Sequence, residues 1–304
     1  MSDRPLVTIA IPAYKVRHLH DSLASALSQT YGNIEVVVVN DRSPEDVASV
    51  VGQFGDPRIR YCENAQNLGK DDPSKNWNEC LRLAQGEWFC LLCDDDVYDA
   101  CFVEELLRVS ERYPQCDVLR SGVVMIDGEG REVGTYPASP GFETLEQYMW
   151  DFFHSRRRQT IGEFMLRRSA IVQAGGYVNL PYAWGSDNLS IFQFAMRNGI
   201  ASTSLRLMTF RDSGENISSD CKHMDVKLMA FQAYIRQTEE MVRKERFRHD
   251  LLPVLDDYYH RAAVAHMIDA NAEDLRNIVR RLKAYHIGIG CVLKALLRRW
   301  FLSH

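Results

Sequence analysis

The segment Ile34–Val39, IEVVVV, consists almost entirely of β-branched residues, which favour extended strands. Successive side chains of a strand point to opposite faces of its sheet, so a nearly continuous apolar run needs cover on both faces. The segment therefore predicts a strand inside a parallel sheet, with helices packed on either side.

The first hundred residues alternate between strand-like and helix-like patterns. The alternating segments are residues 6–11, 18–29, 34–39, 44–54, 59–62, 71–86 and 87–93. Pro44 and Pro73 stand near the start of two helix-like segments, and Gly86 lies just past the end of one. Regular alternation of this kind predicts an α/β fold with a mostly parallel sheet flanked by helices.

The pattern loosens after Asp99. An amphipathic helix (101–114), two strands around a Gly-rich turn (118–136) and a helix near 145–153 are expected, followed by three arginines at 156–158. Gly and Pro become scarce from about residue 220, which favours helices. We therefore expect one domain over 1–219 and a C-terminal helical segment over 220–304.

Composition narrows the class of protein. The chain has 304 residues, of which 46% are hydrophobic and 25% charged, as in soluble globular proteins. A net charge of −5 gives no reason to expect nucleic acid as a partner. Neither a secretory signal nor a bilayer-spanning run is visible, and the eight cysteines are irregularly spaced, which favours reduced thiols in a cytoplasmic protein. The pair Cys90 and Cys93 is interpreted as structural, because no second pair completes a zinc site.

Notable side chains follow three of the predicted strands. The first strand leads into Pro12, Ala13 and Tyr14, the second into Asp41, and the fourth into the acidic triplet 94–96. Ligands of open parallel sheets bind at the carboxyl ends of the strands. An aromatic ring can stack on a base, a carboxylate can accept a base N–H, and an acidic cluster can hold Mg²⁺ or Mn²⁺. Each feature alone also fits packing or an ordinary polar turn. Their combination points to a ligand site more strongly than any one of them does.

These segments resemble a family 2 glycosyltransferase with the GT-A fold, of the bacterial polysaccharide-synthesising type. The resemblance covers roughly residues 5–215 and rests on VTIAIPAYK, VVVVNDRSPED, NAQNLGKDDPSKNWNECL, AQGEWFCLLCDDDVYD, RRSAIVQAGGY, WGSDN and FRDSGENISS. It implies a nucleotide-binding half over 1–99 and an acceptor-side half over 100–219. It also implies a nucleotide-sugar donor.

The resemblance assigns roles on the donor side. The nucleotide-binding residues it implies are Pro12, Ala13, Tyr14, Asp41, Lys70, Asp94 and Arg211. Asp95 and Asp96 would hold Mn²⁺ or Mg²⁺, and which of the two is the main ligand stays open. Relatives often carry a further His in the loop after Arg211; here His223 lies slightly beyond it.

On the acceptor side, the resemblance implies Asp187 as the general base. From the residues alone, Asp187 is more readily interpreted as a helix cap. Tyr182 and Trp184 can stack on a sugar face or pack in the core, and both alternatives stay open. Gly175 and Gly176 form a turn that would lie beside the acceptor.

The tail from Leu275 to His304 contains seven Lys or Arg and no acidic residue. Its last 18 residues place Ile289, Leu293 and Trp300 on one helical face. A basic amphipathic helix of this type can lie on the inner face of the cell membrane. The alternative is a helix that packs on its own domain or on a second subunit, as in a homodimer.

The leading hypothesis is inverting, metal-dependent transfer from a UDP-sugar to a glycan or lipid-linked acceptor. A sugar nucleotidyltransferase is disfavoured, because no Gly-rich loop follows the first strand. A non-catalytic nucleotide-sugar-binding module would explain Asn40, Cys93 and Ser186, where many relatives carry acids. The retained acids, Asp41, Asp95, Asp96 and Asp187, argue against that alternative.

Overall fold

The computed structural model describes residues 4–214, 216, 223–248 and 250–270 of the chain. The chain divides into two compact units, Met1–Asn216 and Ile217–His304. The basic tail from Leu275 onward lies outside the described residues, so the expected membrane helix stays a prediction. No helix in the described ranges has both the length and the apolarity that a membrane span requires.

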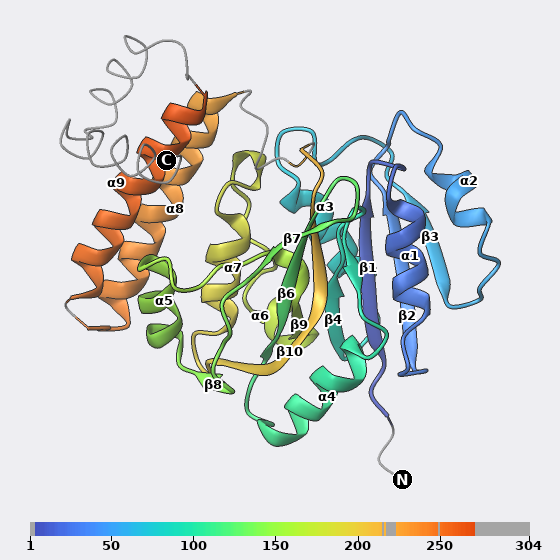
Figure 1. The fold of residues 1–304 in the computed structure, drawn as a ribbon, viewed down its shortest axis with the longest axis horizontal. Coiled ribbons are helices and arrows are strands. Elements are labelled where there is room, and N and C mark those ends of the chain that lie inside the picture. Colours follow the sequence, from blue (N-terminus) through green and yellow to red (C-terminus); the bar gives the residue numbers. More distant parts are fainter. Residues whose placement is uncertain (1–3, 215, 217–222, 249, 271–304) are drawn as a thin grey trace. The chain divides into compact units, whose positions relative to one another are not determined.

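A single mixed sheet forms the centre of the first unit (Figure 1). Its main strands run in the order β3-β2-β1-β4-β9-β6-β10-β5, while β7 pairs with β6 and β8 with β10. Their bounds are β1 Val7–Ala13, β2 Ile34–Asn40, β3 Ile59–Glu63, β4 Trp88–Leu91, β5 Val97–Tyr98, β6 Val118–Asp127, β7 Glu132–Thr135, β8 Phe142–Glu143, β9 Phe164–Arg167 and β10 Ile200–Asp212.

The predicted parallel part of the sheet comprises β3, β2, β1 and β4. Strand β9 then runs antiparallel to both β4 and β6, whereas β6 and β10 are again parallel. The hairpin expected around the Gly-rich turn is formed by β6 and β7.

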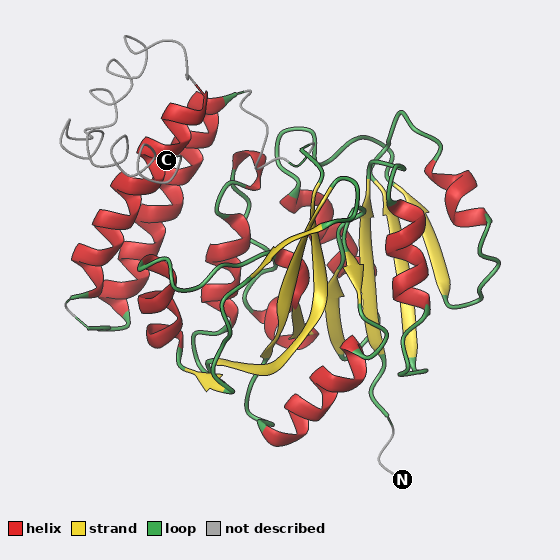
Figure 2. Ribbon diagram, viewed as in Figure 1, coloured by secondary structure: helices red, strands yellow, loops and turns green. Residues whose placement is uncertain are grey.

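Helices cover both faces of this sheet (Figure 2). Their bounds are α1 Leu19–Leu27, α2 Val47–Gly52, α3 Ser74–Leu83, α4 Phe102–Arg112, α5 Leu145–Phe153, α6 Arg168–Gln173 and α7 Ser186–Phe194, with 3-10 turns at Ile161–Glu163 and Pro181–Ala183. All four valines of β2, residues 36–39, are fully buried. The two-sided burial expected of IEVVVV is therefore confirmed.

The start of α2 differs from the expectation. The helix begins at Val47 rather than near Pro44, and the Asp46 carboxylate accepts the Ser49 amide at 3.0 Å as an N-cap. An Asp cap satisfies an amide that would otherwise lack a partner, so it determines the first turn more strongly than the earlier proline.

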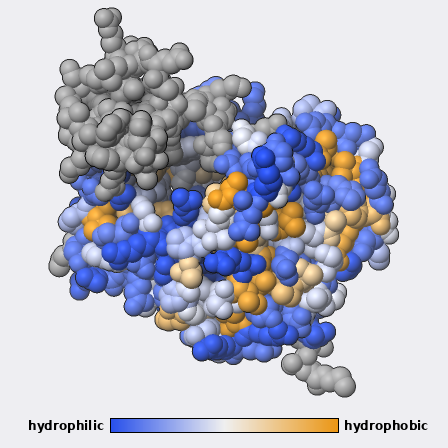
Figure 3. Space-filling model, viewed as in Figure 1, coloured by the Kyte–Doolittle hydropathy of each residue, from blue (hydrophilic) through white to orange (hydrophobic). Residues whose placement is uncertain are grey.

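The surface of the first unit is mostly polar on the face drawn in Figure 3, with apolar side chains in small separate patches. Exposed large apolar residues of this unit, such as Val133, Val172 and Leu205, come from different elements. Burial of the apolar surface therefore takes place mainly between the sheet and its two helical layers.

In the described residues of the second unit there are two long helices, α8 Met224–Lys244 and α9 Leu251–Ala270. The Phe231 ring of α8 lies 6.1 Å from that of Tyr258 and 5.6 Å from that of Tyr259 in α9. Gln232 Nε2 donates to Tyr259 Oη at 3.0 Å. Aromatic packing and this hydrogen bond join the two helices, in agreement with the helical character expected of the segment.

Candidate functional site

The ends of three neighbouring strands form the candidate donor site. Strand β1 lies between β2 and β4, so Tyr14, Asp41 and Asp94 follow adjacent strands. The Asp41 amide donates to the Ala13 carbonyl at 3.0 Å, which ties the first two strand ends together. The sequence predicts these residues on one rim of the sheet, and the structure brings them together there.

Asp94 holds the loop that follows β1. Its Oδ2 accepts from the backbone amides of Tyr14 and Lys15, each at 2.7 Å. Burial raises the pKa of Asp94 to about 6, and these two amides act in the opposite direction. The Tyr14 side chain on this loop stays 41% exposed. Its ring is therefore accessible to a ligand, while its backbone is held.

Asp41 is buried and organises the loop at residues 64–69. Its Oδ1 accepts from Asn64 Nδ2 at 2.7 Å and from the Leu68 amide at 2.8 Å. Its Oδ2 accepts from the Gly69 amide at 2.7 Å. The carboxylate thus shapes the loop that leads to the exposed Lys70, a contribution that sequence analysis did not predict.

The acidic turn after β4, residues 94–96, is bound to the end of β10. Asp96 is 1% exposed, and its Oδ1 accepts the Arg211 amide at 3.0 Å. Asp95 Oδ2 accepts from Asn216 Nδ2 at 3.2 Å. Asp96 Oδ2 is buried and has no hydrogen-bond partner among the described residues. An orphaned buried carboxylate oxygen of this kind is costly unless a ligand satisfies it.

Electrostatics make the acidic turn receptive to a cation. Burial raises the pKa of Asp96 well above its usual range, and the charge of Asp95 raises it further. Burial is also the largest cause of the raised pKa of Asp95. A bound divalent cation would offset both the burial and the mutual repulsion.

The carboxylate oxygens of the acidic turn fit a metal ion that is also bound by a substrate. Within the described ranges, no group of three His, Cys, Asp or Glu is arranged to hold an ion by itself. Asp94 is engaged with the β1 loop, which leaves Asp95 and Asp96. Proteins usually bind Mg²⁺ through one or two carboxylates, and phosphate oxygens and water molecules complete its coordination.

The environment of Arg211 differs from the one expected of an arginine that contacts a phosphate. Its side chain is 9% exposed, and Nε donates to the Asp95 carbonyl at 3.0 Å. Nη2 lies 3.8 Å from Asp21 Oδ2. In this structure Arg211 holds the acidic turn against β10.

Two residues outside the acidic turn, Asn216 and His18, were not predicted from the sequence to interact with it. Asn216 lies within the FRDSGENISS segment, in which relatives often carry a histidine. Burial, followed by the charge of Arg211, lowers the pKa of His18, and the charge of Asp95 acts in the opposite direction. His18 Nε2 is buried without a partner among the described residues. No local sequence pattern indicated the contact between Asn216 and Asp95, since it depends on long-range packing.

Asp187 lies in the first turn of α7. Gly185 precedes the helix with a φ of 88°, a conformation that glycine tolerates best. Burial raises the pKa of Asp187 to about 6, although the amides of Asn188 and of Asp187 itself favour the charged form. Burial is the largest cause of the raised pKa of Tyr136, and the charges of Asp96 and Asp187 raise it further.

The loop before α7 is strained. Tyr182 and Ala183 have φ values of 56° and 51°, in the left-handed region that non-glycine residues avoid. The Tyr182 amide donates to the Asp71 carbonyl at 2.7 Å, which joins this loop to the segment after Lys70. The side chains of Tyr182 and Trp184 are half-buried, so both the packing and the sugar-stacking alternatives remain.

The glycine turn is held by α3. Asn78 Oδ1 accepts the Tyr177 amide at 2.8 Å, and Asn78 Nδ2 donates to the Tyr177 carbonyl at 2.9 Å. A Cβ on Gly176 would come within 2.4 Å of Asn78 Oδ1, whereas nothing lies within 4 Å of one on Gly175. Both glycines have left-handed φ values, 90° at Gly175 and 88° at Gly176.

Gly176→Ala should therefore destabilise the protein more than Gly175→Ala. Backbone strain alone costs about 1–2 kcal/mol at either position, and the clash with Asn78 should add about 1–3 kcal/mol at Gly176. Urea denaturation of both variants measures the difference. Equal midpoints would mean that Asn78 moves aside freely.

Solved structures with a similar fold are known. S. aureus TarS 1–349 in complex with UDP-GlcNAc matches with a TM-score of 0.65 and 17% identity, covering 88% of this chain and 74% of that chain. The mannosyltransferase PcManGT from Pyrobaculum calidifontis, in complex with GDP-Man and Mn²⁺, matches with a TM-score of 0.58 and 15% identity. This match covers 99% of the present chain and 86% of PcManGT. These matches confirm the predicted fold class, a GT-A-type mostly parallel sheet with flanking helices.

The chain belongs to glycosyl transferase family 2, whose family model matches residues 8–173. The Escherichia coli protein WfaP, a UDP-Glc:alpha-D-GlcNAc-diphosphoundecaprenol beta-1,3-glucosyltransferase, is 32% identical over 99 residues, which are 31% of this chain and 36% of WfaP. The match spans 18% to 35% of the length of six other curated relatives. The resemblance inferred from the sequence is thereby confirmed.

Proposed function

We propose that this chain transfers a sugar from a nucleotide-sugar donor to a hydroxyl group of an acceptor, with inversion at the anomeric carbon. The observation that carries the proposal is the convergence of Tyr14, Asp41 and the acidic turn on neighbouring strand ends in a family 2 chain. A UDP-sugar is the proposed donor, which the UDP-GlcNAc complex of TarS and the activity of WfaP support by analogy.

Asp187 is the proposed general base. An attacking hydroxyl must lose its proton, and a carboxylate with a pKa of about 6 is ionised at neutral pH yet basic enough to accept it. Gly175, Gly176, Tyr182 and Trp184 would border the acceptor.

Asp95 and Asp96 would hold Mn²⁺ or Mg²⁺, which the Mn²⁺ complex of PcManGT supports by analogy. The ion would stabilise the leaving diphosphate as a Lewis acid. Tyr14 would stack on the base, and Asp41, through the loop that it organises, would orient the nucleotide and Lys70. Asp94 and Arg211 would keep the β1 loop and the acidic turn in place.

The proposed organisation is a nucleotide-binding half over 1–99, an acceptor-side half over 100–219 and a helical segment over 220–304. A glycan or lipid-linked acceptor is proposed, and the diphosphoundecaprenol-linked acceptor in the name of WfaP supports the lipid-linked form. A cytoplasmic protein with its basic tail on the inner membrane face would meet such an acceptor, and a homodimer is the alternative use of that tail.

A thermal-shift panel of UDP-, GDP-, dTDP- and CMP-sugars, with and without Mn²⁺, tests donor and metal together. A ligand at a hundred times its Kd stabilises by about 2.7 kcal/mol, or roughly 5–10 °C in Tm for a protein of this size. We expect a metal-dependent shift with a UDP-sugar that Asp96→Ala abolishes.

Asp99→Ala is the control for this panel, because it removes an exposed carboxylate three residues further along the chain. Its shift should equal that of the wild type. A shift of the same size in Asp96→Ala, or one independent of metal, would contradict the assignment of the acidic turn.

A further inference from the structure

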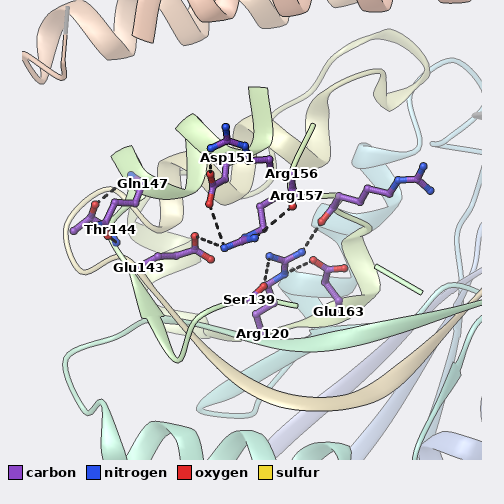
Figure 4. Close-up of polar contacts among 10 residues, drawn as sticks. Arg120, Ser139, Glu143, Thr144, Gln147, Asp151, Arg156, Arg157 and Glu163 are labelled. Carbon is purple, nitrogen blue, oxygen red and sulfur yellow. Dashed lines mark hydrogen bonds and ion pairs between the residues drawn. The ribbon is translucent and has the colours of Figure 1, made fainter. Parts of the chain in front are cut away.

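The segment Arg157–Thr160, termed here the pinned segment, is irregular in structure but is held at four consecutive residues. Figure 4 shows the pairing of Arg157 with Glu143 and Asp151. Arg157 Nη2 lies 3.5 Å from Glu143 Oε2 and 3.3 Å from Asp151 Oδ2. The other three contacts are Arg120 Nη2 to the Arg158 carbonyl, Tyr148 Oη to Gln159 Oε1 at 2.7 Å, and the Thr160 amide to Glu163 Oε2 at 3.4 Å. Both its backbone and its side chains therefore have defined positions.

Arg120, on β6, supplies the most deeply buried of these contacts. The residue is 1% exposed, and its Nε donates to Glu163 Oε1 at 2.6 Å. Its guanidinium carbon lies 5.3 Å from the ring centroid of Tyr148 and 5.9 Å from that of Phe164. A charge buried this far from water costs free energy unless it is paired. One of its N–H groups nevertheless binds the carbonyl of Arg158.

The side chain of Arg158 differs from those of its two arginine neighbours. Arg156 and Arg157 both pair with Asp151. Arg158 is exposed, and its Nη1 lies 3.6 Å from the sulfur of Met125 on β6. Within the described ranges of the chain, no carboxylate lies within ion-pair distance of Arg158. The pinned segment thus presents one guanidinium whose charge is not neutralised by those residues.

This guanidinium lies near the candidate site. Met125 is paired with Phe210 across β6 and β10, and the next residue, Arg211, binds Asp96 through its amide. Gly162, four residues after Arg158, lies beside the acidic turn, since a Cβ on it would come within 3.6 Å of Asp96 Oδ2. The pinned segment therefore leads directly to the acidic turn.

We propose that Arg158 binds a phosphate group of a substrate and that the pinned segment exists to position it. A planar guanidinium donates two parallel hydrogen bonds to phosphate oxygens, so a held arginine selects for that group. The phosphate comes either from the donor diphosphate or from a phosphate-bearing acceptor. The inference rests on the proposed function and extends it to a residue outside the family motifs identified above.

Two binding measurements on the full chain distinguish the sources. Titration calorimetry with inorganic pyrophosphate and Mg²⁺ probes the donor diphosphate site. The acceptor side is probed with the pyrophosphate site saturated. The quantities measured there are the affinities for a GlcNAc-diphospho-alkyl compound and for the neutral alkyl glycoside of GlcNAc. Arg158→Gln should weaken binding of one phosphate probe by about ten- to a hundredfold and leave the neutral glycoside unaffected.

Arg156→Gln is the matched control, since it removes an exposed arginine two residues away. Both variants should keep the wild-type Tm, because the Arg158 carbonyl remains available to Arg120. Weaker pyrophosphate binding assigns Arg158 to the donor, and weaker binding of the diphospho-alkyl probe assigns it to the acceptor. Equal affinity of wild type and Arg158→Gln for both probes, including no measurable affinity in either protein, overturns the proposal.

This experiment separates the inference from the proposed function. If no nucleotide-sugar raises the Tm of the wild type, the proposed function is refuted. If the wild type shows that Tm shift and Arg158→Gln binds both phosphate probes as tightly as the wild type, only the role of Arg158 is refuted. Arg158→Lys should recover part of the affinity, because it keeps the charge but not the bidentate geometry.

Discussion

Asp187→Asn should lower kcat for sugar transfer by roughly 10³-fold and leave donor binding unchanged. The amide has nearly the shape of the carboxylate but cannot accept the proton of the attacking hydroxyl. In the wild type, kcat/KM should fall about tenfold per pH unit below pH 6, because burial raises the pKa of Asp187 to about 6 and only the ionised form acts as a base. Steady-state kinetics across pH 5–8 measure both effects.

The same variant should be more stable than the wild type at neutral pH. A folded-state pKa above the ordinary value of 3.8 means that the native protein binds the proton more tightly than the unfolded chain, so stability falls as pH rises from about 4 to 6. Removing the charge should therefore add up to about 3 kcal/mol at pH 7.5. Urea denaturation at pH 7.5 and pH 4 should show the gain at the higher pH only.

Asp46→Asn serves as the control for charge removal. Hydrogen bonds from Ser49 lower the pKa of this exposed carboxylate, so its replacement should bring no gain in stability at neutral pH and no loss of activity. Full transfer activity in Asp187→Asn would show that another group is the base.

Arg120→Met should destabilise the protein by about 3–5 kcal/mol, because it leaves the carboxylate of Glu163 buried without its partner. Burial already raises the pKa of Glu163 to about 7, and Arg120 is the largest influence that lowers it. Without Arg120 this pKa should rise further. The folded state then favours the protonated acid, so the deficit should grow as pH rises through 7.

Chemical denaturation at pH 5.5 and pH 8 measures this deficit. The double variant Arg120→Met, Glu163→Gln should recover much of the lost stability, because it removes both charges together. A deficit that is equal at the two pH values would mean that lost packing against Tyr148 and Phe164, rather than the unpaired carboxylate, is the cause.

The parallel half of the fold could be predicted because its signals are local. Each strand and helix between Val7 and Leu91 has its own pattern, and chain order then determines the pairing of β1, β2 and β4. The location of Tyr14, Asp41 and Asp94 on one rim follows from that order. Strand β9 was not predicted, because FMLR is short and becomes a strand only by pairing with β4 and β6.

The partners of the site residues could not be predicted. Asp96 binds the Arg211 amide across 115 positions of sequence, and Asp94 binds the Tyr14 amide across 80. Such contacts depend on how the elements pack, and no spacing in the sequence encodes them. The basic run at 156–158 illustrates the same limit, since its pattern does not distinguish the paired Arg157 from Arg158.

By itself, the sequence determined the class of fold, the family and the set of acids at the strand ends, because hydrophobic periodicity and motif order are properties of the chain. Only the tertiary structure decided which oxygens are already engaged, which oxygen of Asp96 has no partner among the described residues, and which of the three arginines at 156–158 has no ion pair with them. The physical reason is that burial and hydrogen bonding to distant backbone determine the charge state and availability of a side chain.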